Sequence, residues 1–157
     1  MPGGRCAVQG VMRMRKITET KNFYPLGVLF HACGLEIDDL ESPPEGTLAM
    51  WRCEDESGAL LGGVNLKRLK GCYILDNLAV REDLRGSGIG LALMETALEE
   101  AKANGAEEIW GCAKVPEYYL TKGWTNVQPE ETPEIFHCQT CGQFGVSCFP
   151  VIIKKGL

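Results

Sequence analysis

Hydrophobic and polar positions repeat along this chain with two different periods, which predicts both helices and strands. The first clear helical pattern covers 23–34, where Pro25 suits a first turn and Gly34 suits a C-terminal cap. A short strand-like piece at 14–18 precedes it. The acidic segment 38–46 contains two consecutive prolines and follows as a loop.

Three apolar runs of strand length come next. They cover 47–53, 59–66 and 72–80, and the turn-like segments 54–58 and 67–71 separate them. Short apolar runs bounded by turn residues are typical of consecutive antiparallel strands. This part of the chain is therefore expected to form an antiparallel meander.

The second half of the chain returns to a helical period. One face of the segment 88–104 is apolar, because it carries Leu91, Met94, Leu98 and Ala101. Asn104-Gly105 ends this helix. We then expect a strand at 108–113, a short helix at 116–121 and further strands beyond. The order predicts an α/β (α+β) fold with one mixed, mainly antiparallel sheet flanked by helices on both faces.

Size and charge limit the classes of protein to consider. The 157 residues, 45% of them hydrophobic, suit one domain over 1–157 with a single core. The net charge of -5 argues against a nucleic-acid partner, because such proteins cluster Lys and Arg against phosphates. Met12 and Met14 are further candidate starts, so 1–11 is expected to be a disordered extension.

The chain carries no segment suited to a membrane. No apolar run approaches the roughly 20 residues that span a bilayer, and no hydrophobic signal segment follows the N-terminus. We therefore expect a cytoplasmic protein without a membrane partner. The eight cysteines are then expected as reduced thiols, metal ligands or redox groups rather than as structural disulfides.

A glycine-rich loop joins the third strand of the meander to the long helix. The loop is Arg85-Gly86-Ser87-Gly88-Ile89-Gly90. Glycines let the backbone approach an anion, and the first N–H groups of the helix have no internal partners, so they can bind a pyrophosphate. The alternative is a turn that merely starts a helix. The Walker sequence is absent, and the dinucleotide fingerprint requires a parallel βαβ unit rather than a meander.

These residues resemble the GNAT superfamily of N-acetyltransferases. The loop 85–90 matches its Gln/Arg-x-x-Gly-x-Gly/Ala signature, and 77–80 resembles the segment that precedes it. The segment 118–124, Tyr-Tyr-Leu-Thr-Lys-Gly-Trp, is similar to the Phe-Tyr-x-x-x-Gly-Phe element found downstream. One departure is that 114–117 contains no Asn, which many members use against the cofactor.

The resemblance implies a binding mode and a chemistry. Acetyl-CoA, or coenzyme A as product, would lie beside the strand that contains Leu78-Ala79-Val80, with main-chain groups polarising the acyl carbonyl. The loop residues Arg85, Gly86, Ser87, Gly88, Ile89 and Gly90 would hold the pyrophosphate. Tyr119 resembles the general acid that protonates the departing thiolate. Asp76, on the same strand, is the candidate base for the amine.

Each candidate catalytic residue also has a purely structural interpretation. Tyr118 and Tyr119 can both pack against the sheet. Asp76 can face solvent or a helix terminus, since side chains alternate along a strand. His31 lies in an apolar helix and is expected as a core histidine rather than a catalyst.

The C-terminal part, 134–157, is rich in cysteine. Cys138 and Cys141 have the spacing of a metal knuckle, and Cys148 with His137 could complete a tetrahedral zinc site. Buried reduced thiols and a redox pair remain alternatives. The sequence does not decide among these three.

The acceptor is suggested only by a looser resemblance. Glu130, Pro133 and Phe136, followed by Cys-Phe-Pro at 148–150, resemble bacterial amino-acid acetyltransferases related to N-acetylglutamate synthase. This implies a small amino acid or primary amine as acceptor. A protein amino group, or a non-catalytic CoA-binding module with a metal-sensing or redox-sensing tail, are the alternatives. The sequence leaves open whether the chain forms a homodimer.

Overall fold

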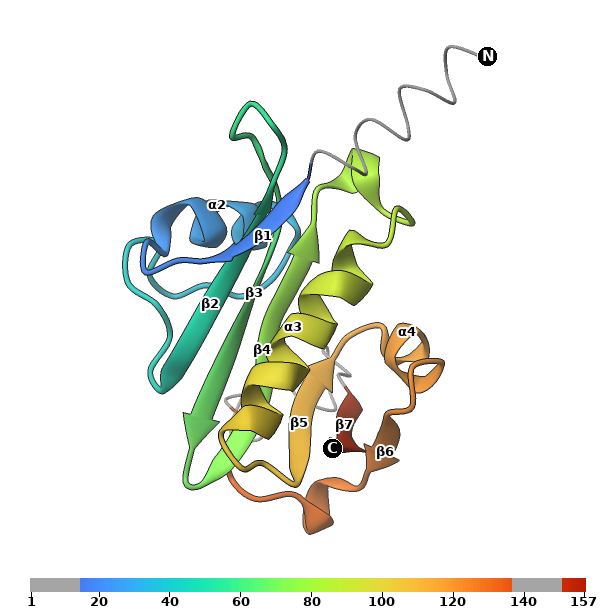
Figure 1. Cartoon of the computed structure of the whole chain (residues 1–157). Coiled ribbons are helices and arrows are strands. Elements are labelled where there is room, and N and C mark those ends of the chain that lie inside the picture. The colour runs from blue at the N-terminus through green and yellow to red at the C-terminus, as the bar shows by residue number, and fades with distance from the viewer. Residues whose placement is uncertain (1–14, 137–150) are drawn as a thin grey trace.

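The computed structural model describes residues 15–136 and 151–157. The helices and strands of these residues follow each other in the order β1 (Lys16–Glu19), α2 (Tyr24–Ala32), β2 (Thr47–Glu54), β3 (Leu60–Leu69), β4 (Cys72–Val80), α3 (Ile89–Ala103), β5 (Glu108–Ala113), α4 (Pro116–Leu120), β6 (Thr125–Val127) and β7 (Val151–Gly156) (Figure 1). Short 3-10 turns follow β4 at Glu82–Leu84 and β6 at Pro129–Glu131. The described strands form a seven-stranded sheet in the order β1-β2-β3-β4-β5-β7-β6.

The sheet is mixed but mainly antiparallel, as the sequence predicts. The predicted meander forms β2, β3 and β4, which pair in antiparallel fashion with β1 on the outer edge. The parallel pair joins β4 to β5, and α3 makes the crossover between them. A parallel pair requires such a long connection, because a tight turn can only reverse the chain.

One predicted turn is wrong in its extent. The segment expected as a turn, 67–71, belongs largely to β3, which continues to Leu69. The chain reverses over two residues only, Lys70 and Gly71, with φ values of 51° and 78°. A two-residue turn with both φ values positive matches the twist of the paired strands, so the hairpin is tighter than the polar sequence suggested.

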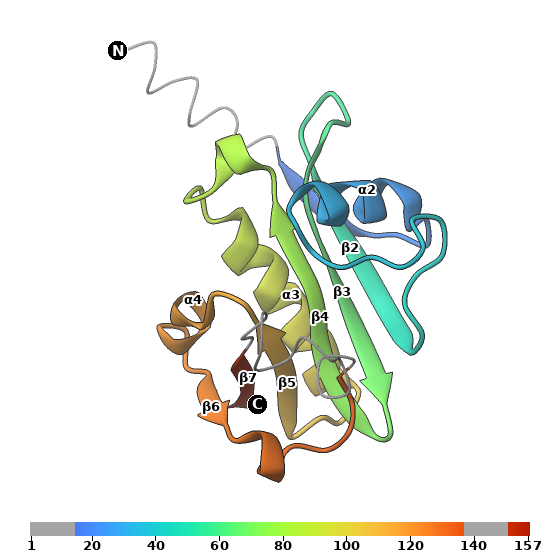
Figure 2. The same cartoon turned by 180° about the vertical axis from the view of Figure 1, so that it is seen from behind.

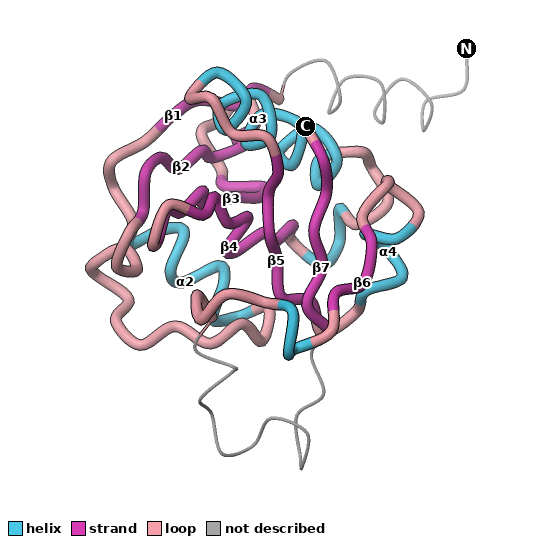
Figure 3. Tube along the Cα trace, turned by 90° about the horizontal axis from the view of Figure 1, so that it is seen from below, coloured by secondary structure: helices cyan, strands magenta, loops and turns pink. Residues whose placement is uncertain are grey.

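The helices α2 and α3 cover opposite faces of the sheet (Figures 1 and 2). The α3 side chains Leu93, Met94 and Ala97 pack with sheet residues in the larger core cluster. The α2 side chains Leu26 and Phe30 pack on the other face in a smaller cluster. Seen from below, the strands lie between these two helices (Figure 3). The central strands are therefore buried on both faces of the sheet.

Within α2, His31 corrects one expectation. The helix buries Leu26, Gly27 and Phe30, whereas His31 is exposed. A helix that packs on one face of a sheet buries only one stripe of its surface, and His31 lies outside that stripe. It is therefore not the core histidine that the apolar sequence suggested.

Candidate active site

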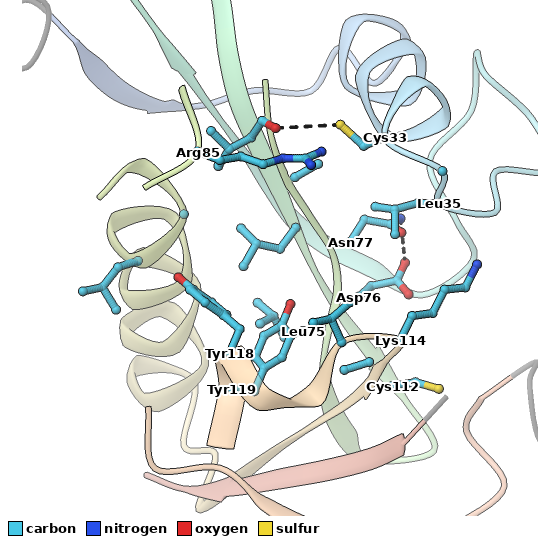
Figure 4. Close-up of a pocket in the computed structure, with 18 of the residues that line it drawn as sticks. Cys33, Leu35, Leu75, Asp76, Asn77, Arg85, Cys112, Lys114, Tyr118 and Tyr119 are labelled. Carbon is cyan, nitrogen blue, oxygen red and sulfur yellow. Dashed lines mark hydrogen bonds between the residues drawn. The ribbon is translucent and has the colours of Figure 1, made fainter. Parts of the chain in front are cut away.

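A cleft opens where β4 separates from β5. Among the described residues the two strands share one register pair, Ile74 with Trp110, and the later residues of β4 have no register pair with β5. The cleft measures about 900 Å³. Its walls come from β4, the end of α2, the loop before α3, the end of β5, and α4 (Figure 4). Segments far apart in sequence therefore meet at one site.

A β-bulge lies at the point of separation. The register of β3 and β4 pairs Asn65 with Asn77 and Leu66 with Leu75, so Asp76 is an additional residue on β4. A bulge bends its strand and increases the local twist. The bulge lies two residues after Ile74, the residue of β4 that pairs with β5, so the strand bends close to that pair. Local sequence does not predict this irregularity.

The glycine-rich loop lies at one end of the cleft. Gly88 is the N-cap residue of α3 with a φ of 89°, and Gly86 has a φ of 83°. Of the six predicted loop residues, Arg85, Gly86, Gly88 and Gly90 line the cleft. These left-handed conformations suit glycine, and they turn the chain so that the first N–H groups of α3 lie at the end of the loop.

The side chains of the other two loop residues, Ser87 and Ile89, contact the protein rather than the cleft. The Ser87 hydroxyl donates to the Leu84 carbonyl, and the Ser87 carbonyl accepts a 3.0 Å hydrogen bond from Arg15 Nη1. The Ile89 side chain is 1% exposed and packs in the main core cluster. The side chains of Ser87 and Ile89 therefore anchor the loop, and only their backbone remains available to a ligand.

The predicted strand segment Leu78-Ala79-Val80 lines the same cleft. Its backbone lies on the part of β4 that has no register pair with β5. The Val80 carbonyl faces Cys33 Sγ at 3.8 Å, at the C-terminal end of α2. Backbone groups of an unpaired strand can bind an extended ligand as a further strand would.

Tyr118 and Tyr119 both line the cleft but point in different directions (Figure 4). The Tyr118 hydroxyl lies against the loop, because a Cβ on Gly90 would be 3.4 Å from its oxygen. The Tyr119 hydroxyl points into the cleft, while its ring contacts Trp124 edge to face at 5.7 Å between centroids. Burial, and to a lesser extent Tyr118, raises the pKa of Tyr119 to about 12. Tyr119 is therefore a protonated donor at neutral pH.

Asp76 lines the cleft rather than facing bulk solvent or a helix terminus. Its Oδ2 accepts hydrogen bonds from Asn65 Nδ2 at 3.1 Å and from Asn77 Nδ2 at 3.2 Å. Its Oδ1 lies 3.9 Å from Lys67 Nζ. Burial raises the pKa of Asp76, and Lys67 and the Asn65 hydrogen bond oppose that shift. A carboxylate with a raised pKa is a better proton acceptor than an exposed one.

A second hollow of about 340 Å³ adjoins the cleft at Asp76. The two hollows share Lys67, Asp76 and Asn77, and Glu36 also lines both. The remaining walls come from the loop between α2 and β2, and their charged members are Asp38, Asp39 and Glu45. The end of the cleft beyond Asp76 is therefore rich in carboxylates.

The sequence also matches a family model. The model of the acetyltransferase (GNAT) family matches residues 12–117, which is more than half of the chain. The chain belongs to the GNAT acetyltransferase family. It is therefore an acetyl-CoA-dependent acyltransferase, and the predicted family and enzyme class are confirmed.

Solved structures agree with the GNAT fold. The N-acetylglutamate synthase of Neisseria gonorrhoeae, solved with coenzyme A and N-acetyl-glutamate, matches 91% of this chain with a TM-score of 0.74 and 18% identity. This chain spans 35% of the length of that synthase. A GNAT acetyltransferase of Staphylococcus aureus matches with a TM-score of 0.70, 16% identity and coverage of 91% and 99% of the two chains.

An acetyltransferase of Streptococcus agalactiae gives a similar match. Its TM-score is 0.69 at 16% identity, with coverage of 92% of this chain and 99% of that one. No curated protein matches the sequence. Identities this low support the fold, and they leave the acceptor of this GNAT protein to be argued from its own residues.

The predicted zinc ligands Cys138, Cys141 and Cys148 lie outside the described residues, as does His137. Within 15–136 and 151–157 there is no cluster of three or more His, Cys, Asp or Glu side chains able to hold a metal. The zinc site of this GNAT protein stays a prediction. No helix in the described parts of the chain is long and apolar enough to cross a membrane.

Sequence reasoning missed several residues of the site. Asn65 and Lys67 on β3 reach Asp76 from the neighbouring strand, and Cys33 reaches Val80 from α2. Nothing in their local sequence distinguishes them from other strand or helix residues. Strand register brings Asn65 and Lys67 to Asp76, and the packing of α2 on the sheet brings Cys33 to Val80.

Proposed function

We propose that this GNAT protein transfers the acetyl group of acetyl-CoA to a primary amine that is a small amine or amino acid. The observation that carries the proposal is the gap between β4 and β5. The glycine-rich loop lies at one end of this gap, and Asp76 and Tyr119 line it further along. One cleft therefore combines a phosphate-binding loop with a candidate base and a candidate acid.

The charges and shape of the cleft fit coenzyme A. The protein has a net charge of -5, yet Arg85, Lys114 and Lys122 all line this cleft. Gly86 and Gly88 have no Cβ, which suits their positive φ values and leaves the loop surface open, and a helix N-terminus favours negative charge. We infer that residues 85–90 bind the pyrophosphate and that backbone groups of 78–80 bind the pantetheine arm.

Acetyl-CoA supplies an activated acyl group in the form of a thioester. Asp76 takes a proton from the amine, so that the nitrogen can attack the acyl carbon. Backbone N–H groups of β4 polarise the acyl carbonyl. As the carbon–sulfur bond breaks, the Tyr119 hydroxyl gives a proton to the sulfur. The proton taken by Asp76 and that given by Tyr119 balance after exchange with solvent.

The charge beyond Asp76 favours a neutral or cationic acceptor over an acidic one. Four carboxylates of the second hollow lie there, on Glu36, Asp38, Asp39 and Glu45. Like charges in a cleft repel an acidic ligand, whereas a second ammonium group would be attracted. N-acetyl-glutamate is the ligand of the Neisseria structure, and this hollow argues for a different acceptor here.

A lysine side chain on a protein is the second candidate acceptor. The same acidic hollow is the observation that favours it, because lysine side chains are cationic amines flanked by backbone. A protein lysine brings its flanking backbone into the cleft, whereas a free amine does not. A panel that contains both types of acceptor separates them.

The test is acetyl-CoA turnover by the full-length chain against a panel of acceptors. The panel contains aliphatic diamines, free lysine, a lysine peptide, glycine, glutamate and aspartate. Thiol release gives the rate, and mass spectrometry identifies the acetylated product. We expect diamines or lysine to exceed glutamate by about tenfold or more in kcat/KM, which corresponds to about 1.4 kcal/mol.

The control is the Asp76→Asn variant, which should lose transfer to every acceptor. A preference for glutamate would contradict the acceptor class but leave acetyl transfer intact. Absence of turnover with every acceptor, together with absence of coenzyme A binding, would contradict the function itself.

A further inference from the structure

We propose that Asn65 on β3 is a positioning residue that orients the carboxylate of Asp76 and holds the bulge of β4 in place. The proposal rests on the proposed role of Asp76 as the base. Asn65 is not part of the cleft wall, so it acts through Asp76 rather than on a substrate.

The bulge leaves the backbone of β4 in need of a partner. Asp76 is the additional residue, and Asn77 resumes the register opposite Asn65. The Asn77 N–H donates to Asn65 Oδ1 at 3.0 Å. A side-chain oxygen thus binds a backbone N–H at the residue where the bulge disturbs the strand ladder.

This contact also fixes which way the Asn65 amide faces. The Asn77 N–H can only donate, so the atom of Asn65 that meets it must be the oxygen. The nitrogen is then directed to Asp76, where Nδ2 donates to Oδ2 at 3.1 Å. One carboxamide therefore serves both neighbouring residues, and only a side chain with a donor and an acceptor can do so.

The two oxygens of Asp76 are thereby made different. Oδ2 accepts from both Asn65 and Asn77, while Oδ1 receives no hydrogen bond from the described residues and lies 3.9 Å from Lys67 Nζ. Oδ1 is therefore the atom available to accept the proton of an amine in the cleft. Fixing Oδ2 prevents the carboxylate from rotating away.

The hydrogen bonds between Asn65, Asp76 and Asn77 are shielded from water. Asn65 is 0% exposed and its neighbour Asn77 is 8% exposed, so water does not replace a lost partner. Burial raises the pKa of Asp76, while Lys67 and then the Asn65 hydrogen bond lower it. Other charged groups also line the two hollows. The carboxylates come from the loop after α2, and the cations from the loop before α3, from the residue after β5 and from the turn after α4; they are Glu36, Asp38, Asp39, Glu45, Arg85, Lys114 and Lys122.

Two variants separate the two hydrogen bonds of Asn65. Asn65→Asp keeps an oxygen for the Asn77 N–H but replaces the donor to Asp76 with a second carboxylate. Asn65→Leu keeps the number of side-chain heavy atoms and removes both bonds. Asn126→Asp and Asn126→Leu, at an exposed position on β6, are the matched controls.

Two measurements are made on each full-length variant. The first is the pH dependence of kcat/KM with the best acceptor. The second is the titration of the Asp76 carboxyl by carbon-13 NMR in the ligand-free protein, assigned by its loss in Asp76→Asn. Coenzyme A affinity is measured alongside, because the Asn65 side chain bonds to Asp76 and Asn77 and not to the 85–90 loop.

We expect both Asn65 variants to shift the Asp76 titration and the acid limb of kcat/KM to higher pH. Loss of a donor to the charged form raises a carboxyl pKa, and a second carboxylate raises it further. The expected change at a pH well below the wild-type limb is about tenfold, because a shift of one unit changes the small ionised fraction there by about that factor. Coenzyme A affinity should stay within about twofold in Asn65→Asp, which keeps the bond to the Asn77 N–H, and the Asn126 variants should match the wild type.

Failure of the two proposals can be told apart. If both Asn65 variants fold and keep the wild-type Asp76 titration and pH profile, the positioning role is overturned while acetyl transfer stands. If the wild type transfers no acetyl group, the carboxyl titration still tests Asn65 without any turnover. If Asn65→Leu does not fold, Asn65→Asp decides the question, since it keeps the bond that holds the bulge.

Discussion

Ile74 on β4 pairs with Trp110 on β5, and the described residues contain no other register pair between these strands. Ile74 is 1% exposed and Trp110 is 6% exposed, and both belong to one core cluster with Ile135 and Ile152. Two residues beyond Ile74 lies the bulge at Asp76, which bends β4. The cleft thus starts where the packed part of the sheet ends.

Gly88→Val should weaken coenzyme A binding without unfolding the protein. Gly88 has a φ of 89°, a conformation that costs a side-chain-bearing residue about 1–2 kcal/mol. A relaxed loop would withdraw the N–H groups that bind the pyrophosphate, so we expect Kd to rise about tenfold or more. Calorimetric titration with coenzyme A measures it.

The matched control for that variant is Gly105→Val. Gly105 has a φ of 93° after the C-terminal end of α3, and a Cβ there would meet nothing within 4 Å. It should lose a similar amount of stability and keep its coenzyme A affinity. Unchanged affinity in Gly88→Val would remove the loop from the cofactor site.

Tyr119→Phe should lower kcat while leaving the KM for acetyl-CoA nearly unchanged. The substitution removes the hydroxyl that points into the cleft and keeps the ring that packs on Trp124. General acids contribute on the order of 10²-fold or more, so a loss of that size is expected. Steady-state kinetics provide the test, with Tyr118→Phe as the matched variant. A larger loss in Tyr118→Phe would mean that Tyr118 is the acid.

The pH profile gives an independent check on Tyr119. Its pKa of about 12 keeps the hydroxyl protonated throughout an ordinary assay range. Wild-type kcat should therefore show no alkaline limb due to Tyr119 below about pH 10, the pKa of an unperturbed tyrosine. An alkaline limb near pH 8 that disappears in Tyr119→Phe would contradict this.

Asp76→Asn should abolish most activity and yet stabilise the fold at neutral pH. Because burial raises the folded-state pKa of Asp76 above 3.8, folding favours the protonated carboxyl. The stability of the wild type is therefore highest below the unfolded pKa and falls as pH rises through the folded pKa. The Asn variant lacks this loss, so its Tm advantage should grow from pH 3.5 to pH 7.

Thermal unfolding at several pH values measures this advantage. The exposed pair of Arg81 with Asp83 offers a control, because Asp83→Asn removes a carboxylate whose pKa the Arg81 hydrogen bonds lower. The Tm of Asp83→Asn relative to the wild type should therefore fall as the pH rises from 3.5 to 7. A Tm advantage of Asp76→Asn that shrinks with rising pH would mean that its carboxylate is stabilising.

The cysteines of the C-terminal part give a prediction about metal. If Cys138, Cys141 and Cys148 bind zinc, the purified protein should contain close to one zinc per chain, and Cys138→Ser or Cys141→Ser should each lose it. Elemental analysis and thiol titration measure both. Metal-free protein with a Cys138–Cys141 disulfide would support a redox pair, and free thiols would support packing. Acetyl transfer should depend on the 85–90 loop more than on any metal.

The elements of this fold were largely predictable from local sequence. The predicted strand at 108–113 matches β5 residue for residue, and the predicted helix at 88–104 contains α3 with its caps at Gly88 and Asn104. The helix has a strong local signal, an apolar period with glycine and asparagine at its ends, and the strand is a short apolar run. The turn at 67–71 was overestimated, because Lys67 is polar although it points into the cleft.

The sequence by itself determined the order of elements, the glycine-rich loop and the family, because each depends on residues that are neighbours in the chain. The tertiary structure alone decided what surrounds Asp76. Asn65 on β3 meets it through strand register, and the register shifts by one residue at that point. A bulge depends on the pairing of two strands and not on the preference of any single residue, so no local sequence pattern predicts it. The environment that raises the pKa of Asp76 is therefore a property of the folded sheet.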